Sequence, residues 1–149
     1  MKRWLSQSVE ATERVGHELA EALRPDGCLL LYADLGAGKT VLVRGLARGL
    51  GIPVDEIQSP TYTLSREHRA GGTELAHLDL YRLSPAEVEA AGVEERLLGP
   101  GIKVVEWAER LPFPVPGALE IEIRKLPDGA REIVERDGGS RRPGVPNAG

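Results

Sequence analysis

One short segment, ADLGAGKT at residues 33–40, strongly limits the folds open to this chain. It matches the phosphate-binding pattern G-x-x-x-x-G-K-[ST] except at its first position, where Ala33 replaces glycine. The pattern requires a buried strand before the loop and a helix after it. Residues 28–33 form a continuous apolar run of strand length, and in residues 39–50 leucines recur every four residues, as on one face of a helix. The sequence therefore predicts a strand, a phosphate-binding loop and a helix, in that order.

The alanine at the first position is compatible with such a loop. Ala33 lies where the strand turns into the loop, and alanine fits there as long as its φ is negative. Gly36 and Gly38 allow the backbone to approach phosphate closely, Lys39 can reach the β and γ phosphates, and the Thr40 hydroxyl can ligate Mg²⁺. The residues predicted to bind the nucleotide through this loop are Asp34, Leu35, Gly36, Ala37, Gly38, Lys39, Thr40 and Val41.

ATP is favoured over GTP by elimination. Proteins that resemble small GTPases read guanine through an Asn-Lys-x-Asp motif, and the one asparagine of this chain is Asn147, close to its end. No positive signature for adenine is present, so the prediction of ATP and Mg²⁺ as cofactors rests on the loop and on this exclusion.

The remaining periodicities complete an α/β pattern. Residues 8–23 have a helical apolar stripe, Gly71-Gly72 marks a hairpin within 59–83, and SPAE at 84–87 carries a capping box for a helix expected to end near Gly92. Further strands are predicted at 102–107, 119–124 and 131–136. The expected fold class is α/β, a single P-loop NTPase-like domain over residues 1–136 with a mixed β-sheet, flanking helices and β-hairpins. Residues 137–149 are predicted to be a flexible C-terminal tail.

The strand at 119–124 shows regular alternation. Apolar and polar residues alternate here: Leu119, Ile121 and Ile123 are apolar, and Glu120, Glu122 and Arg124 are polar. One face of this strand is therefore predicted to be buried and the other to be exposed to water.

Composition argues against direct contact with nucleic acid or membrane. The net charge is −4 and aromatic residues make up 4% of the chain, whereas nucleic-acid binders need a basic field and stacking rings. We therefore expect no DNA partner, and we expect any RNA to be held by a partner protein. No apolar run approaches the 18 or so residues of a membrane span, and no secretory signal is recognisable at the N-terminus, so a cytoplasmic location is expected. The single cysteine, Cys28, lies in an apolar run and is predicted to be buried and unreactive.

Two acidic residues end apolar strand segments. A phosphate-binding loop needs an acidic group for Mg²⁺, usually at the end of a neighbouring strand, and Glu106 in IKVVEW occupies such a position. We predict a metal role for Glu106, with a solvated strand end as the alternative, and a surface position for Glu109. Asp79 could orient or deprotonate an attacking water, or hold Mg²⁺ through a water.

The segment HLDLY places His77, Asp79 and Tyr81 on one strand face. A lone histidine such as His77 is more often a hydrogen-bonded structural residue than a functional one. Arg82 could balance phosphate charge or form a surface ion pair. The segment SPTYTL carries two threonines, Thr61 and Thr63, on one strand face. They could sense the γ-phosphate, as in switch regions, or belong to an ordinary polar edge strand.

Taken together, ADLGAGKT, SPTYTL, HLDLYRL and VVEWAE resemble, in this order and spacing, the TsaE family (also called YjeE) of bacterial P-loop ATPases. The resemblance extends from about Thr12 to Arg136 and departs from the family at Ala33, where glycine is common. It implies a role in making N6-threonylcarbamoyladenosine (t6A) on tRNA, as an ATPase that docks on the TsaB–TsaD heterodimer and meets tRNA only indirectly through these partners. On this interpretation we predict that hydrolysis is slow alone and increases when the heterodimer is added.

The resemblance also implies residue roles. Lys39 would hold phosphate, Thr40 and Glu106 would ligate Mg²⁺, Asp79 would serve hydrolysis, and Thr61 would belong to a switch-like loop that contacts ATP. The catalytic residues predicted in this way are Lys39, Asp79 and Glu106. Two other readings of the same residues are a small-molecule kinase and a module that binds ATP without hydrolysing it.

Overall fold

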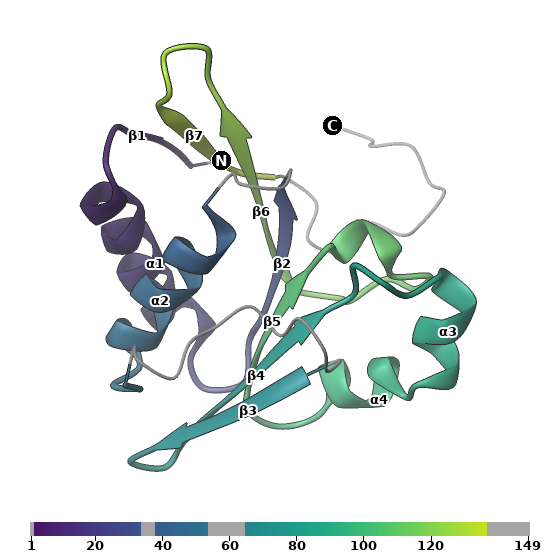
Figure 1. The fold of residues 1–149 in the computed structure, drawn as a ribbon. Helices are drawn as coiled ribbons and strands as arrows, with labels where there is room; N and C mark the ends of the chain where they lie inside the picture. The colour runs from purple at the N-terminus through teal and green to yellow at the C-terminus, as the bar shows by residue number, and fades with distance from the viewer. Residues whose placement is uncertain (1, 34–37, 54–64, 137–149) are drawn as a thin grey trace.

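The computed structural model describes residues 2–33, 38–53 and 65–136 of the chain. Within these ranges seven strands form one mixed sheet with helices on both faces (Figure 1). The strand order is β1 (Arg3–Ser6), β7 (Arg131–Glu135), β6 (Leu119–Lys125), β2 (Cys28–Ala33), β5 (Ile102–Glu106), β4 (Thr73–Asp79) and β3 (Ser65–Ala70). The four central strands β6, β2, β5 and β4 are parallel, and antiparallel partners are added on both sides. The predicted α/β class with a mixed sheet is confirmed.

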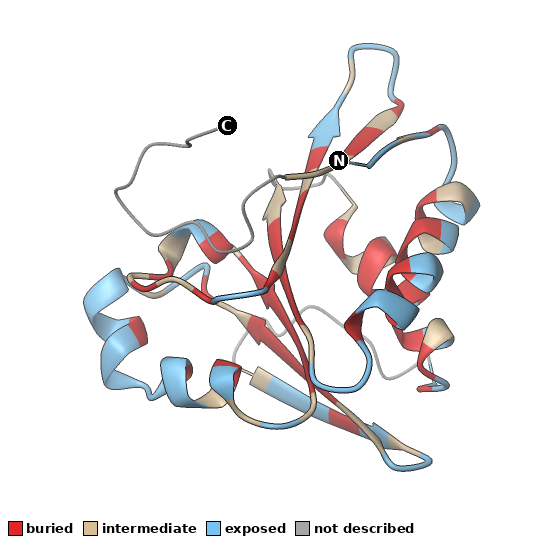
Figure 2. Ribbon diagram, turned by 180° about the vertical axis from the view of Figure 1, so that it is seen from behind, coloured by how far each residue is buried: buried red, intermediate tan, exposed pale blue. Residues whose placement is uncertain are grey.

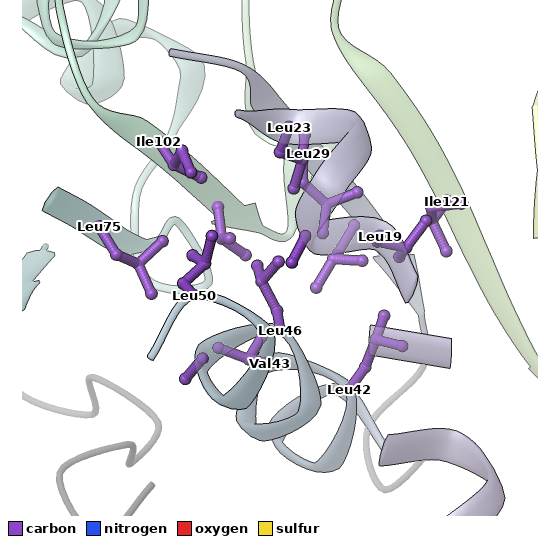
Figure 3. Close-up of a cluster of buried hydrophobic side chains, with 14 of the residues drawn as sticks. Leu19, Leu23, Leu29, Leu42, Val43, Leu46, Leu50, Leu75, Ile102 and Ile121 are labelled. Atoms are coloured by element: carbon purple, nitrogen blue, oxygen red, sulfur yellow. The ribbon is translucent and has the colours of Figure 1, made fainter. Parts of the chain in front are cut away.

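Two layers of different construction cover the sheet. Helices α1 (Val9–Leu23) and α2 (Lys39–Gly49) pack on one face, where a core of aliphatic side chains fills the interface (Figure 3). The other face is covered by shorter helices, and their outer surfaces are exposed (Figure 2). These are α3 (Pro85–Ala90), α4 (Val93–Leu98) and the 3₁₀ turn η2 (Ala108–Arg110). The face covered by the two long helices is therefore the more extensively packed one, and it is the face on which α2 begins.

Helices α1 and α2 touch backbone to backbone. A Cβ atom on Gly16 would lie 2.1 Å from the carbonyl oxygen of Leu42, and one on Gly45 would lie 2.0 Å from that of Glu13. Both distances are far below any real contact, so only glycine fits at either position. The close approach holds α2, with Lys39 as its first residue, tightly against α1.

Helix ends are set by the residues that the sequence marks. Ser8 caps α1 by accepting a hydrogen bond from the Ala11 amide, and Ser84 forms the predicted capping box with Glu87. At the end of α2, Gly51 has a φ of 78°, and the amides of Gly51 and Ile52 bond back to the carbonyls of Arg48 and Ala47. This is a Schellman motif, the C-terminal cap that glycine favours.

Four details differ from the sequence-based expectations. The strand β1 was not predicted, and the helix that begins after Ser84 stops at Ala90, because the chain turns at Gly92 (φ 73°) into the separate helix α4. Strand β5 ends at Glu106 because Trp107 has a φ of 60°, which no strand accommodates. Strand β4 ends at Asp79, since the chain turns there and the Leu83 amide bonds to the Leu80 carbonyl.

The predicted wet face of β6 is wrong at Glu120. This residue is buried, and its Oε1 accepts a hydrogen bond of 2.8 Å from the Tyr32 hydroxyl on the neighbouring strand β2. The cause is side-chain cover on this face: the Tyr32 ring reaches Glu120 from β2, and the Arg136 guanidinium packs on that ring, 3.8 Å from its centroid. Glu122 on the same face pairs with Arg124 and Arg136.

Within the described ranges, no helix has the length and apolar character needed to span a bilayer. The predicted tail at 137–149 lies outside those ranges and stays a prediction.

Candidate functional site

The carboxyl ends of β4 and β5 and the start of α2 bring three of the predicted site residues together. Asp79 and Glu106 are direct partners in the parallel register of β4 and β5. Lys39 is the first residue of α2, and its Nζ lies 3.9 Å from Glu106 Oε1. All three predicted catalytic residues therefore meet at one edge of the sheet, on the face covered by α1 and α2.

Lys39 is held by a carboxylate and an aromatic ring. Only 8% of the residue is exposed, and its ammonium lies 4.3 Å from the centroid of the Trp107 ring, in addition to the ion pair with Glu106. A cation over an indole face is attracted by the quadrupole of the ring. Trp107 in turn packs against Tyr81, with ring centroids 4.8 Å apart.

Trp107 is a residue of this site that sequence reasoning missed. Among the described non-glycine residues it alone has a positive φ, a conformation that costs on the order of 1–3 kcal/mol and tends to persist at functional sites. The left-handed turn places the indole beside Lys39 directly after Glu106. The residue stands inside VVEWAE, but no local pattern indicates a left-handed tryptophan.

Glu106 is buried, with 2% of its surface exposed, and both its oxygens have partners. Oε1 faces Lys39, and Oε2 is hydrogen-bonded to Nε2 of His77, which is fully buried. His77 was expected to be a hydrogen-bonded structural residue. It is hydrogen-bonded, and its partner is the carboxylate predicted to bind the metal.

Asp79 is half-buried, and its Oδ1 accepts a hydrogen bond of 2.9 Å from the Tyr81 amide. Burial raises the pKa of Asp79, and repulsion by the Glu106 carboxylate adds to this, although the Tyr81 amide, Lys39 and His77 act in the opposite direction. His77 and Asp79 share a strand face as predicted. Tyr81 does not, because β4 has ended before it and its ring packs on Trp107 instead.

The first turn of α2 supplies the remaining groups of the site. Gly38 precedes the helix with a φ of 103°, which favours glycine, and Thr40 and Val41 follow Lys39. Amides of a first helical turn have no carbonyl partner within the helix and carry partial positive charge, so they attract phosphate. The other predicted nucleotide-binding residues, Asp34, Leu35, Gly36, Ala37 and Thr61, lie outside the described residues.

The donor set suits magnesium together with phosphate. The described part of the chain has no group of three or more His, Cys, Asp or Glu residues that could hold a metal ion by itself. It does bring together the carboxylates of Asp79 and Glu106 near the helix turn that carries the Thr40 hydroxyl, all of them oxygen donors. Mg²⁺ bound with a nucleotide is commonly held by one or two carboxylates plus phosphate oxygens, so these residues fit the ion.

Arg82 and Glu109 are both exposed, the latter as predicted.

The fold and the site define the class of the protein: a single-domain α/β protein in which a lysine and two carboxylates meet beside a helix N-terminus, after a P-loop sequence. The chain belongs to the TsaE family, whose model, described as threonylcarbamoyl adenosine biosynthesis protein TsaE, matches residues 6–133. The predicted family is thereby confirmed.

Individual relatives agree with this assignment. The chain is 51% identical over 108 residues to a Synechocystis protein named tRNA threonylcarbamoyladenosine biosynthesis protein TsaE, covering 70% of this chain and 68% of that protein. It is 36% identical over 140 residues to a Bacillus subtilis protein of the same name, covering 93% and 87%. The crystal structure of Bacillus subtilis YdiB superposes with a TM-score of 0.69 at 32% identity, covering 90% of this chain and 83% of that one.

Proposed function

We propose that this chain is a Mg²⁺-dependent ATPase that serves the bacterial tRNA t6A modification machinery as an accessory component acting on TsaB–TsaD, in the cytoplasm. The observation that carries the proposal is the contact between Lys39 and Glu106. It lies at the edge of the sheet where α2 begins with the last two residues of the P-loop sequence. The printed names of the relatives, which refer to t6A biosynthesis, support the biological context.

The residues divide the work by their chemistry. The ammonium of Lys39 binds phosphate oxygens, and the first-turn amides of α2 add further donors. Thr40 and Glu106 hold Mg²⁺, which when bound would neutralise charge on the phosphates. Asp79 orients the attacking water or accepts its proton, and its raised pKa makes it a better base than an ordinary aspartate.

Contact with tRNA is assigned to the partner proteins. The acidic net charge of −4 is unfavourable for gripping a polyanion, whereas a protein–protein contact needs no basic field. The chain thus acts on the complex that carries the RNA.

The test is ATP hydrolysis with and without TsaB–TsaD, using wild type and Lys39→Ala. We expect slow hydrolysis alone, a clear increase with the partner pair, loss of both rates in Lys39→Ala, and dependence on Mg²⁺. Exposed Lys125→Ala, remote from the site in sequence and on another strand, serves as the matched control and should behave as wild type. Rapid turnover alone with no response to the partners, or transfer of the γ-phosphate to a metabolite in place of water, would contradict the proposal.

A further inference from the structure

The two ring nitrogens of His77 have different surroundings. Nε2 is hydrogen-bonded to Oε2 of Glu106, while Nδ1 is buried and has no hydrogen-bond partner in the structure. No part of the ring is exposed, so water does not reach it from the surface. This asymmetry determines which nitrogen carries the proton.

A neutral imidazole has one N–H donor and one lone pair. A proton on Nδ1 would leave a buried donor without an acceptor and would turn the Nε2 lone pair towards a carboxylate oxygen. A proton on Nε2 is instead donated to Glu106, and only a lone pair remains unpaired. Since a buried donor without a partner is costly, Nε2 carries the proton.

The consequence concerns the orientation of Glu106. With Oε2 engaged by His77, the carboxylate cannot rotate freely, and Oε1 stays on the side of the Lys39 ammonium, 3.9 Å away. His77 lies two residues before Asp79 on the same strand face, so β4 supplies both the second carboxylate and the group that orients the first.

We propose that His77 is a positioning residue, which through its Nε2–H holds Oε2 of Glu106 and keeps Oε1 on the side of Lys39, where Oε1 would ligate Mg²⁺ beside the bound phosphates. The metal part of this inference rests on the proposed function, whereas the assignment of the proton does not. In proteins, partners that orient a metal ligand are typically worth about 10- to 100-fold in metal affinity or activity.

The first test reads the proton directly, in ¹⁵N-labelled protein without nucleotide or metal. Long-range ¹H–¹⁵N correlation spectra distinguish protonated from unprotonated ring nitrogens, and the signals of His77 are those that vanish in His77→Gln but persist in His17→Gln, a change at an exposed histidine. We expect Nε2 to be protonated. An unprotonated Nε2 would overturn the inference.

The second test compares replacements that keep or remove the donor. Glutamine places a side-chain N–H near the position of Nε2, whereas leucine offers none. We expect His77→Leu to weaken the apparent Mg²⁺ affinity in ATP hydrolysis by about tenfold or more. His77→Gln should retain most of that affinity, and binding of a fluorescent nucleotide without Mg²⁺ should stay unchanged in both.

A purely structural histidine would not separate these readouts. Equal Mg²⁺ affinity in all three proteins, or a glutamine variant as impaired as the leucine variant while both unfold at the wild-type denaturant midpoint, would overturn the positioning role. Absence of ATP hydrolysis in the wild type would instead defeat the proposed function, and the spectra would still decide where the proton lies.

Discussion

Two buried lysines lie at opposite ends of the parallel strands and differ in their partners. Lys39 follows the carboxyl end of β2 and faces the Glu106 carboxylate and the Trp107 ring. Lys103, the second residue of β5, is 1% exposed and donates to the main-chain carbonyls of Asp26 (2.8 Å) and Gly99 (2.6 Å). Burial of a lysine therefore does not mark a functional site by itself; the chemistry of its partners does.

The lysine at the amino end ties loops together. Its two bonds join the loop before β2 to the end of α4, and because the bonded partners are uncharged carbonyls, burial lowers the pKa of Lys103. The adjacent residue in the sheet register is Cys28, whose thiol pKa is raised by burial to about 12. The predicted burial of Cys28 is confirmed. The buried polar side chain at this end of the parallel strands, Lys103, thus has a structural role.

The largest expected effects come from exchanging the two lysines for methionine, which keeps most of each side chain's volume. Lys103→Met leaves two part-buried main-chain carbonyls without their donor, so we expect it to lower the free energy of unfolding by about 1–3 kcal/mol and to leave nucleotide affinity unchanged. Urea denaturation and nucleotide titration measure the two quantities on the same preparation.

Lys39→Met is the reciprocal control. Loss of a charge-assisted contact to phosphate should weaken nucleotide binding by about 100-fold. Its effect on the free energy of unfolding should be smaller than that of Lys103→Met, since Glu106 keeps its bond to His77. If both variants lost unfolding free energy and nucleotide affinity in the same proportion, the division into a structural lysine, Lys103, and a nucleotide-binding lysine, Lys39, would be wrong.

A smaller effect is expected at Asp79. Its folded pKa is raised above 3.8, so the folded protein retains a proton that the unfolded chain has lost, and stability decreases as pH rises from about 3.8 through the folded pKa. Asp79→Asn removes this penalty and should be more stable than wild type at neutral pH while hydrolysing ATP poorly. Thermal unfolding between pH 3 and 8 gives the profile.

Asp128→Asn is a suitable comparison, because Oδ1 of the exposed Asp128 also accepts a hydrogen bond from the amide two residues later. A gain in stability at neutral pH as large in Asp128→Asn as in Asp79→Asn would show that the effect belongs to this kind of turn and not to the site.

The smallest effect concerns the thiol of Cys28. Because burial keeps it protonated at neutral pH, a disulfide reagent should not modify the folded protein measurably within the time that it modifies the protein unfolded in urea. Absorbance of the released thiolate follows the reaction. Rapid modification of the native protein would mean that the sheet edge around Cys28 and Lys103 opens readily, which would contradict a structural role for these residues.

Much of the site follows from local sequence. The P-loop segment predicts the strand, the helix and Lys39, and an acid that ends an apolar strand identifies Glu106. Their meeting follows because the carboxyl ends of parallel strands share one edge of a sheet.

What was missed depends on contacts between distant residues. Strand β1 exists through its pairing with β7, more than a hundred residues later, and Glu120 is covered by Tyr32 of a distant strand. The bond between His77 and Glu106 joins two strands, and the left-handed Trp107 packs against Tyr81 and Lys39, both distant in sequence. None of these leaves a periodic signal in the chain.

The contact between α1 and α2 limits how far Lys39, the first residue of α2, can move. Since neither Gly16 nor Gly45 has room for even a methyl group, the two helices behave as one rigid block, and a shift of α1 would carry α2 with it. The position of Lys39 thus depends on one glycine in each helix, Gly16 in α1 and Gly45 in α2, and a larger residue at either would displace the lysine without touching it.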